Sequence, residues 1–313
     1  MALTLTIAVF VVLQLTTLLN ASAIRSAQHA SDGEMNFDPM PSTPQLTFNT
    51  TGRSRYDRKQ PDYTAIASTP DGNHLLLVDD ANRRVKVMAV TSSGDVRLTS
   101  TIRLSKDLWD IAVLPDGLVA VTTFKNSYIY LLSLQGDNIE FTSRFHAHKR
   151  YDAVAAGPDN NTLLVTSGTY LDVITYDGSI LKSFNVSEFK TPDYLCSASG
   201  DDVIVSDWSK NELYRVNART GQVTETKSHP DMNAPHQAAM DKGGNLYEAS
   251  KGTNRVMVMS PAGEWRTPVE GNTLPIGVAV TANDVIVSWD EYFITSEWNY
   301  RSVIKGYSMA DVN

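Results

Sequence analysis

A short apolar strand followed by a turn recurs six times along this chain, at intervals of 40 to 45 residues. These strands begin near Ile66, Ile111, Val154, Leu195, Ala238 and Val278. A second apolar strand follows each turn, a third follows a polar corner, and a more polar fourth strand ends most units. Four short antiparallel strands at this period are typical of one blade of a β-propeller. Because radial stacking buries both faces of such sheets, the repeat predicts an all-β, six-bladed β-propeller with four antiparallel strands per blade.

The two ends of the chain together supply the strands of the sixth blade. The sixth unit stops after its third strand, at VIKGYSMADVN (303–313). The segment QLTFNTTG (45–52) is strand-like, because Leu46 and Phe48 alternate with polar neighbours and one face can pack inward. We predict that this N-terminal strand pairs with residues 302–308 and closes the last blade. Residues 44–313 then form a single propeller domain.

The N-terminus predicts export. Residues 1–23 carry no charged side chain and end in Ala-Ser-Ala, so we expect a signal peptide that is cleaved after Ala23. A retained signal anchor is the alternative, although polar residues interrupt the apolar run. Residues 24–43 lack hydrophobic periodicity and are predicted to form a flexible leader. No later segment approaches about 18 consecutive apolar residues, so we expect a secreted protein with no membrane span after cleavage.

Three further features concern modification, redox chemistry and partners. Sequons at Asn49, Asn160 and Asn185 are predicted glycosylation sites in a secretory pathway. Cys196 is the only cysteine, and we expect a small buried hydrophobe there, with a reactive thiol or an intermolecular bridge as the alternative. The formal net charge is −8 and the basic residues are scattered, which disfavours nucleic acid or an anionic membrane as the main partner.

Two units carry a recognisable repeat. The segments AIASTPDGNHLLLVDDANRRVKVM (65–88) and QAAMDKGGNLYEASKGTNRVMVMS (237–260) resemble the repeat of the six-bladed NHL-repeat propellers. The resemblance covers about residues 45–313, is weakest in the sixth unit, and keeps the family's inner-strand glycine only at Gly277. The regucalcin/gluconolactonase and strictosidine-synthase-like propellers resemble the chain more distantly. Such a resemblance implies the fold much better than an activity.

Polar and aromatic residues open the inner strands. In a propeller these positions face the central channel, and we expect the following side chains at its mouth: Trp109, Asp110, Asp152, Asp193, Tyr194 and His236. Hard oxygen ligands and a histidine suit a divalent cation, Ca²⁺ foremost, so Asp110, Asp152, Asp193 and His236 are the candidate metal ligands. The alternative is a solvated rim that holds only water. Lactonase-like propellers hold their metal with a Glu in an E-G-P-type opening, and the first inner strand here, DYTAIAST (62–69), has none.

The sixth unit contains an unusual stretch, SWDEYFITSEWNYRS (288–302), between its second and third strands. We interpret it as a long aromatic corner in which Trp289, Tyr292 and Trp298 bind a ligand. The alternative is that it packs on the N-terminal segment at the seam of the ring. In the first unit, Asp80 and its neighbours are predicted to form a corner hydrogen-bond network rather than a site.

Two functions follow as hypotheses. The first is a secreted propeller that binds an extracellular protein, glycan or small molecule on one face or at the central channel, since no catalytic set is apparent from spacing. The alternative is a metal-dependent hydrolase or lyase of the lactonase-like propeller class, which would use the three channel aspartates and His236.

Overall fold

A computed structural model describes residues 45–91, 95–270, 273–281, 284–294 and 298–308. The predicted signal peptide and leader lie outside the described residues. No described helix is long and apolar enough to span a membrane.

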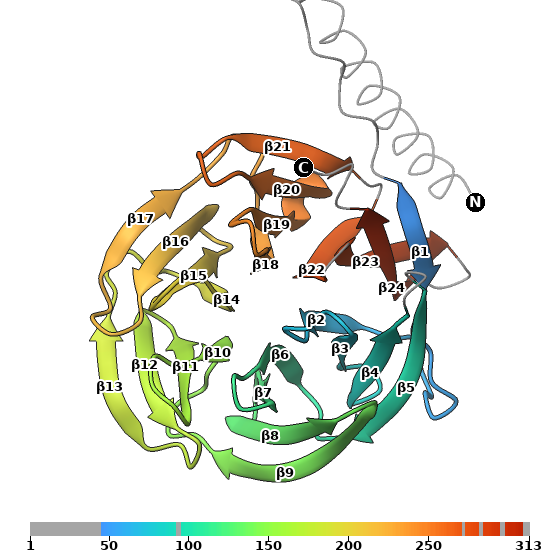
Figure 1. Ribbon diagram of the computed structural model, residues 1–313, viewed down its shortest axis with the longest axis horizontal. Coiled ribbons are helices and arrows are strands. Elements are labelled where there is room, and N and C mark those ends of the chain that lie inside the picture. Colours follow the sequence, from blue (N-terminus) through green and yellow to red (C-terminus); the bar gives the residue numbers. More distant parts are fainter. Residues whose placement is uncertain (1–44, 92–94, 271–272, 282–283, 295–297, 309–313) are drawn as a thin grey trace, which may run out of the picture. The chain divides into compact units, whose positions relative to one another are not determined.

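Six four-stranded antiparallel sheets surround a central channel, which confirms the predicted propeller (Figure 1). Blade 1 consists of β2 (Tyr63–Ser68), β3 (His74–Asp79), β4 (Arg84–Val90) and β5 (Val96–Arg103). Blade 2 consists of β6 (Leu108–Val113), β7 (Leu118–Thr123), β8 (Tyr128–Gln135) and β9 (Asn138–His146). Blade 3 consists of β10 (Val154–Ala156), β11 (Thr162–Ser167), β12 (Tyr170–Thr175) and β13 (Ile180–Asn185).

The remaining blades follow the same order around the ring. Blade 4 consists of β14 (Pro192–Ser197), β15 (Asp202–Asp207), β16 (Glu212–Asn217) and β17 (Val223–Lys227). Blade 5 consists of β18 (Pro235–Met240), β19 (Leu246–Ser250), the 3₁₀ turn η1 (Lys251–Thr253), β20 (Arg255–Met259) and β21 (Trp265–Glu270). Blade 6 consists of β22 (Leu274–Val280), β23 (Asp284–Ile294), β24 (Trp298–Ser308) and β1 (Leu46–Thr50).

The ring closes as the two chain ends predicted. β1 pairs antiparallel with β24, with Asn49 opposite Lys305 and Thr50 opposite Ile304. The expected inward packing of Leu46 is wrong, because its side chain is 48% exposed. The closure therefore depends on the backbone ladder more than on this side chain.

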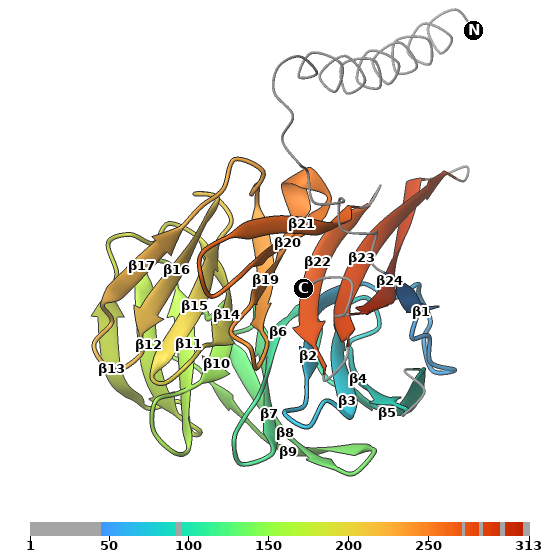
Figure 2. The same ribbon diagram turned by 45° about the horizontal axis from the view of Figure 1, so that its top comes forward.

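The interpretation of residues 288–302 as a long corner is also wrong. β23 and β24 pair continuously out to Ile294 opposite Trp298, and this hairpin extends beyond the neighbouring strands (Figure 2). Branched and aromatic residues favour strands, which explains why the segment pairs instead of looping. Trp289 is 1% exposed in the core of blade 6 and is not a surface ligand contact. Tyr292 and Trp298 belong to the hairpin, but their side chains lie outside the described residues.

Apolar side chains from neighbouring blades interlock to form the core. Between blades 1 and 2, for example, Val78 and Val85 share a cluster with Ile111 and Val121. A cluster of charged side chains is buried at blade 1, where Lys86 Nζ lies 2.6 Å from Asp57 Oδ2 and 2.7 Å from Asp79 Oδ2. Since Asp57 precedes the first blade, this network attaches the closing segment to the ring.

Candidate functional site

The channel contains two cavities. The inner strands β2, β6, β10, β14, β18 and β22 all begin at one end of the ring, and we call the cavity there the upper mouth. It has a volume of about 320 Å³. Its lining residues are Asp62, Tyr63, Thr64, Asp80, Asp107, Leu108, Trp109, Phe124, Lys125, Tyr194, His236, Lys251, Ile276 and Asp290.

An aromatic row crosses the upper mouth. The rings of Trp109 and Tyr194 are stacked with centroids 6.0 Å apart, and the His236 ring lies 5.4 Å from Tyr194. Phe124 extends the row, 5.0 Å from Trp109. Tyr194 is fixed because its hydroxyl donates a hydrogen bond of 2.9 Å to the carbonyl of Thr64, across the channel in blade 1. Three residues predicted from strand position therefore do meet at one cavity.

Two polar atoms in this row have no partner among the described residues. They are Trp109 Nε1 and His236 Nδ1, and both are buried. Burial, with a smaller effect from Lys251, lowers the pKa of His236 to about 3. The imidazole is therefore neutral at physiological pH and can donate through one nitrogen and accept through the other.

The three predicted aspartates do not line the upper mouth. Asp110 is fully buried, where Oδ1 accepts from the Ile111 amide (2.8 Å) and Oδ2 accepts from the Val154 amide (3.0 Å). This carboxyl joins blade 2 to blade 3, and burial raises its pKa to about 8. Asp152 forms an ion pair of 3.1 Å with Arg150. Burial, reinforced by Asp152 and Asp207, raises the pKa of Asp193 to about 7.

The proposed ligand set is therefore not brought together. Among the residues that the structure describes, no group of three or more His, Cys, Asp or Glu side chains is arranged to hold a metal ion. Both oxygens of Asp110 already accept backbone hydrogen bonds, which leaves this carboxyl occupied. A divalent cation elsewhere at the mouth stays a prediction.

Four other carboxylates, which the sequence reasoning missed, line the upper mouth: Asp62, Asp80, Asp107 and Asp290. Burial raises the pKa of Asp80, and the nearby Asp62 and Asp107 raise it further. Burial raises the pKa of Asp290 to about 6, and Asp62 adds to the effect. Asp80 also accepts a 2.8 Å bond from the Leu108 amide of blade 2, and within its own corner its carbonyl accepts a 3.0 Å bond from the Arg83 amide.

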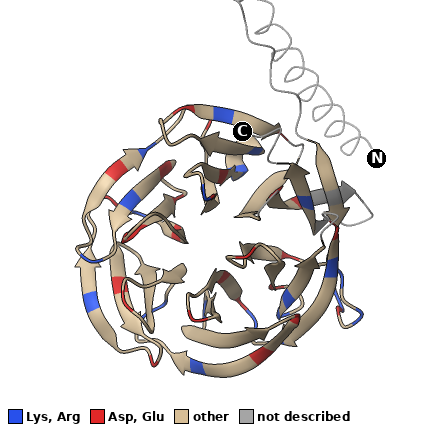
Figure 3. Cartoon of the chain, viewed as in Figure 1, with Lys and Arg blue, Asp and Glu red and all other residues tan. Residues whose placement is uncertain are grey.

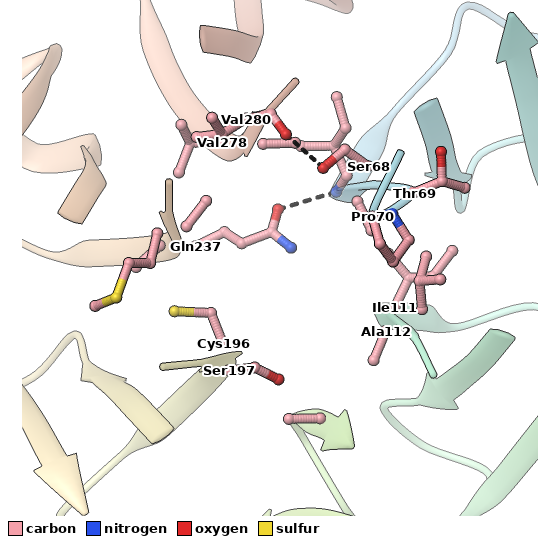
Figure 4. A pocket seen from close by; sticks show the side chains of 18 of the residues that line it. Ser68, Thr69, Pro70, Ile111, Ala112, Cys196, Ser197, Gln237, Val278 and Val280 are labelled. Carbon is pink, nitrogen blue, oxygen red and sulfur yellow. Dashed lines mark hydrogen bonds between the residues drawn. The ribbon is translucent and has the colours of Figure 1, made fainter. Parts of the chain in front are cut away.

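The opposite end of the channel holds the lower cavity, of about 620 Å³, which has mostly apolar walls (Figure 4). Gln237 Oε1 accepts a 2.9 Å hydrogen bond from the Ile66 amide, and Ser68 Oγ donates to the Val280 carbonyl at 2.6 Å (Figure 4). Cys196 is half-buried in this wall, and burial raises the pKa of its thiol to about 12. The thiol is thus protonated at neutral pH, as a structural cysteine would be.

The fold and its channel define the chain as a six-bladed β-propeller. No family model and no curated protein matches its sequence. Among solved structures it is similar to a streptogramin B lyase, with a TM-score of 0.57 and 15% identity over 84% of this chain and 87% of that one. It is also similar to virginiamycin B lyase from Staphylococcus aureus (TM-score 0.56, 12% identity, 84% of this chain and 99% of that one). The WD40 β-propeller domain of Doa1 has a TM-score of 0.57 and 12% identity over 85% of this chain and 97% of that one. Identities this low establish similarity of fold alone.

Proposed function

We propose that this propeller binds a small organic cation, an amine or a quaternary ammonium, in its upper mouth. The observation that carries the proposal is the combination of four carboxylates with a tryptophan around one cavity of about 320 Å³. That volume suits a small ligand, since typical ligand cavities begin near 300 Å³.

The charge of the mouth favours a cation. Four carboxylates line it against two lysines, Lys125 and Lys251, and Lys125 already lies 3.6 Å from Asp107. The repulsion from Asp62 that raises the pKa of both Asp80 and Asp290 would be relieved by a bound positive charge. Perturbed carboxyls in a cleft are typical of functional sites.

The aromatic row favours an organic cation over a bare ion. A cation over an indole face gains about 0.5–2 kcal/mol, depending on its desolvation. The neutral His236 and the unpartnered Trp109 Nε1 add hydrogen-bonding capacity for a hydroxyl or carbonyl of the same ligand. A metal ion would use neither the indole face nor that donor.

Other features of the proposal rest on the sequence. Export is expected from residues 1–23, and Asn49, Asn160 and Asn185 are all exposed, as glycosylation would require. Membership of the NHL-repeat class rests on the repeats at 65–88 and 237–260. The metal-dependent hydrolase or lyase stays the alternative, and two of the similar structures are those of lyases.

Calorimetric titration with choline tests this function. The comparison ligand is 3,3-dimethylbutan-1-ol, which has the same shape without the charge. We expect choline to bind, the neutral isostere to bind at least tenfold more weakly, and Asp62→Asn to reduce choline affinity several-fold. Glu264→Gln is the matched control, because this exposed carboxylate lies at the opposite end of blade 5. Equal binding of the two ligands, or tight binding of Ca²⁺ without choline binding, would refute the proposal.

A further inference from the structure

The propeller topology sorts the connecting loops onto two ends. Every second strand runs back to the end where the inner strands begin, and so does every fourth strand. The loops after these strands therefore surround the upper mouth, and we call them the upper loops. In the described chain they are residues 51–62, 80–83, 104–107, 124–127, 147–153, 168–169, 186–191, 208–211, 228–234, 251–254 and 273. The turns at the opposite end are the lower loops.

Exposed charges differ sharply between the two sets of loops. Among the described residues of the upper loops, the exposed carboxylates are Glu188 and Asp231, whose side chain is 48% exposed, against ten exposed cations: Arg53, Arg55, Arg58, Lys59, Arg83, Lys106, Lys125, Arg150, Lys190 and Lys210. The lower loops carry two exposed cations, Arg219 and Lys242, against eight exposed carboxylates: Asp71, Asp95, Asp116, Asp137, Asp159, Asp177, Asp201 and Glu264. A chain with a net charge of −8 thus presents one basic end. Part of this charge is visible in the loop that follows β1, at the right of Figure 3.

Few of these cations are neutralised within the described protein. Lys125 lies 3.6 Å from Asp107, and Arg150 forms its ion pair with Asp152. Lys190 and Lys210 are exposed and form no ion pair with any described residue. Apart from Glu188 and Asp231, the carboxylates of these loops are half-buried or buried, whereas the ten cations are exposed. The outer surface of this end is therefore positive.

Exposed aromatic rings lie among these cations. Tyr56 is 52% exposed, Tyr170 is 42% exposed, and Trp208 is 43% exposed. Tyr56 and Trp208 belong to upper loops, and Tyr170 is the first residue of β12 after one of them. The Lys149 ammonium lies 4.4 Å from the Tyr170 ring centroid. Exposed rings beside cations suit a ligand that offers flat apolar faces together with negative groups.

We infer that the upper loops form a binding surface for an anionic polysaccharide. Sugar rings stack on exposed aromatic side chains, while sulfate or carboxylate groups pair with the arginines and lysines. A polysaccharide is favoured over nucleic acid because the N-terminus predicts export. The inference does not depend on the amine site. Exposed charges are screened over about 8–10 Å at physiological salt, so half-buried carboxylates in the mouth and cations at the loop tips can act separately.

Heparin, a sulfated polysaccharide, is the probe that tests this inference. We expect the wild-type protein to be retained on immobilised heparin at 0.15 M NaCl despite its net negative charge. The double variant Lys190→Glu/Lys210→Glu should elute at clearly lower salt, and its plot of log affinity against log salt should be shallower by roughly 2. The matched control is Lys182→Glu/Lys242→Glu, which makes the same charge change at exposed positions away from the upper loops. Its elution should stay close to that of the wild type.

Three results would overturn the inference. The first is that the wild type is not retained on heparin at 0.05 M NaCl. The second is that the two double variants lose heparin retention equally. The third is that the protein binds single-stranded DNA more tightly than heparin at the same salt. The outcome is separable from that of the amine site. Asp62→Asn should leave heparin retention unchanged, and Lys190→Glu/Lys210→Glu should leave choline binding unchanged.

Discussion

A single carboxyl group in blade 5 occupies a position that is aliphatic in every other blade. Glu248 lies on β19 opposite Ala238, and it is completely buried. The residues paired in the same way in the other blades are Leu77, Val121, Val165, Val205 and Val287. Neither oxygen of Glu248 has a hydrogen-bond partner among the described residues. We therefore expect Glu248→Leu to stabilise the protein.

The size of this effect follows from protonation. Burial raises the pKa of Glu248 well above its usual value, so the folded protein keeps a proton that the unfolded chain releases. Each pH unit between the unfolded and folded pKa costs about 1.4 kcal/mol of stability. Because the unfolded pKa is near 4.3, the cost reaches up to roughly 3–4 kcal/mol at pH 7. The leucine variant avoids this cost, so the pH-dependent part of its advantage should vanish near pH 4 and grow as the pH rises.

Urea unfolding of the wild type and Glu248→Leu at pH 4.5, 6.0 and 7.5 measures this difference. Glu264→Gln is the control, since it removes an exposed carboxylate from the same blade and should change the free energy of unfolding by less than about 0.5 kcal/mol. A destabilised Glu248→Leu at pH 7.5, or a gain that does not change with pH, would refute the reasoning. Destabilisation would mean that Glu248 is ionised and paired in the folded protein, whereas a gain independent of pH would mean that its pKa is the same in the folded and unfolded chain.

Three other perturbations test how the ring is held together. Lys86→Met removes the buried cation shared by Asp57 and Asp79, and only Asp57 keeps another, Arg84 at 3.9 Å, so the change should cost about 3–5 kcal/mol in urea unfolding; a loss below 1 kcal/mol would contradict the buried network. A chain that begins at Arg53 lacks β1 and exposes the edge of β24, so it should aggregate or melt well below a chain that begins at Ser42; equal melting temperatures would disprove the closure. Tyr194→Phe removes the hydroxyl bonded to Thr64 across the channel and should cost about 1 kcal/mol, which an unchanged urea midpoint would exclude.

The blade count was predictable because it depends on periodicity alone. Each inner strand had to be apolar and each turn polar, and this pattern survives substitutions that obscure the repeat elsewhere. The closing strand was predictable for a related reason, since a missing fourth strand at one end matched an unassigned strand at the other. The hairpin at 284–308 could not be predicted in this way. Aromatic and branched residues such as Trp289 suit both a recognition loop and a buried strand, and only the observed strand pairing distinguishes a loop from a strand.

The site was predictable only where strand position determines which way a side chain faces. Trp109, Tyr194 and His236 open inner strands and line the upper mouth, as expected. Asp110 opens a strand too, yet its carboxylate turns to the amides of neighbouring strands, because a buried carboxylate is satisfied by backbone donors that the sequence does not display. Asp62 was missed because it stands one residue before the first inner strand, outside the positions that the strand pattern counts.

The distribution of charged residues over the two ends of the ring follows from the topology and could not be read from the sequence. Lys106, Lys190 and Lys210 are far apart in the sequence and look like ordinary scattered surface residues, which is why composition disfavoured nucleic acid or an anionic membrane as the main partner. A propeller returns the chain to the same end after every second strand, so residues in alternate turns share one face whatever their separation. The lower loops collect aspartates because Asp caps tight turns, as Asp71 does by accepting from the Asn73 amide at 3.0 Å. Turn geometry does not require lysine or arginine in the upper loops. Their excess of cations therefore indicates function more directly than the excess of aspartates in the lower loops does.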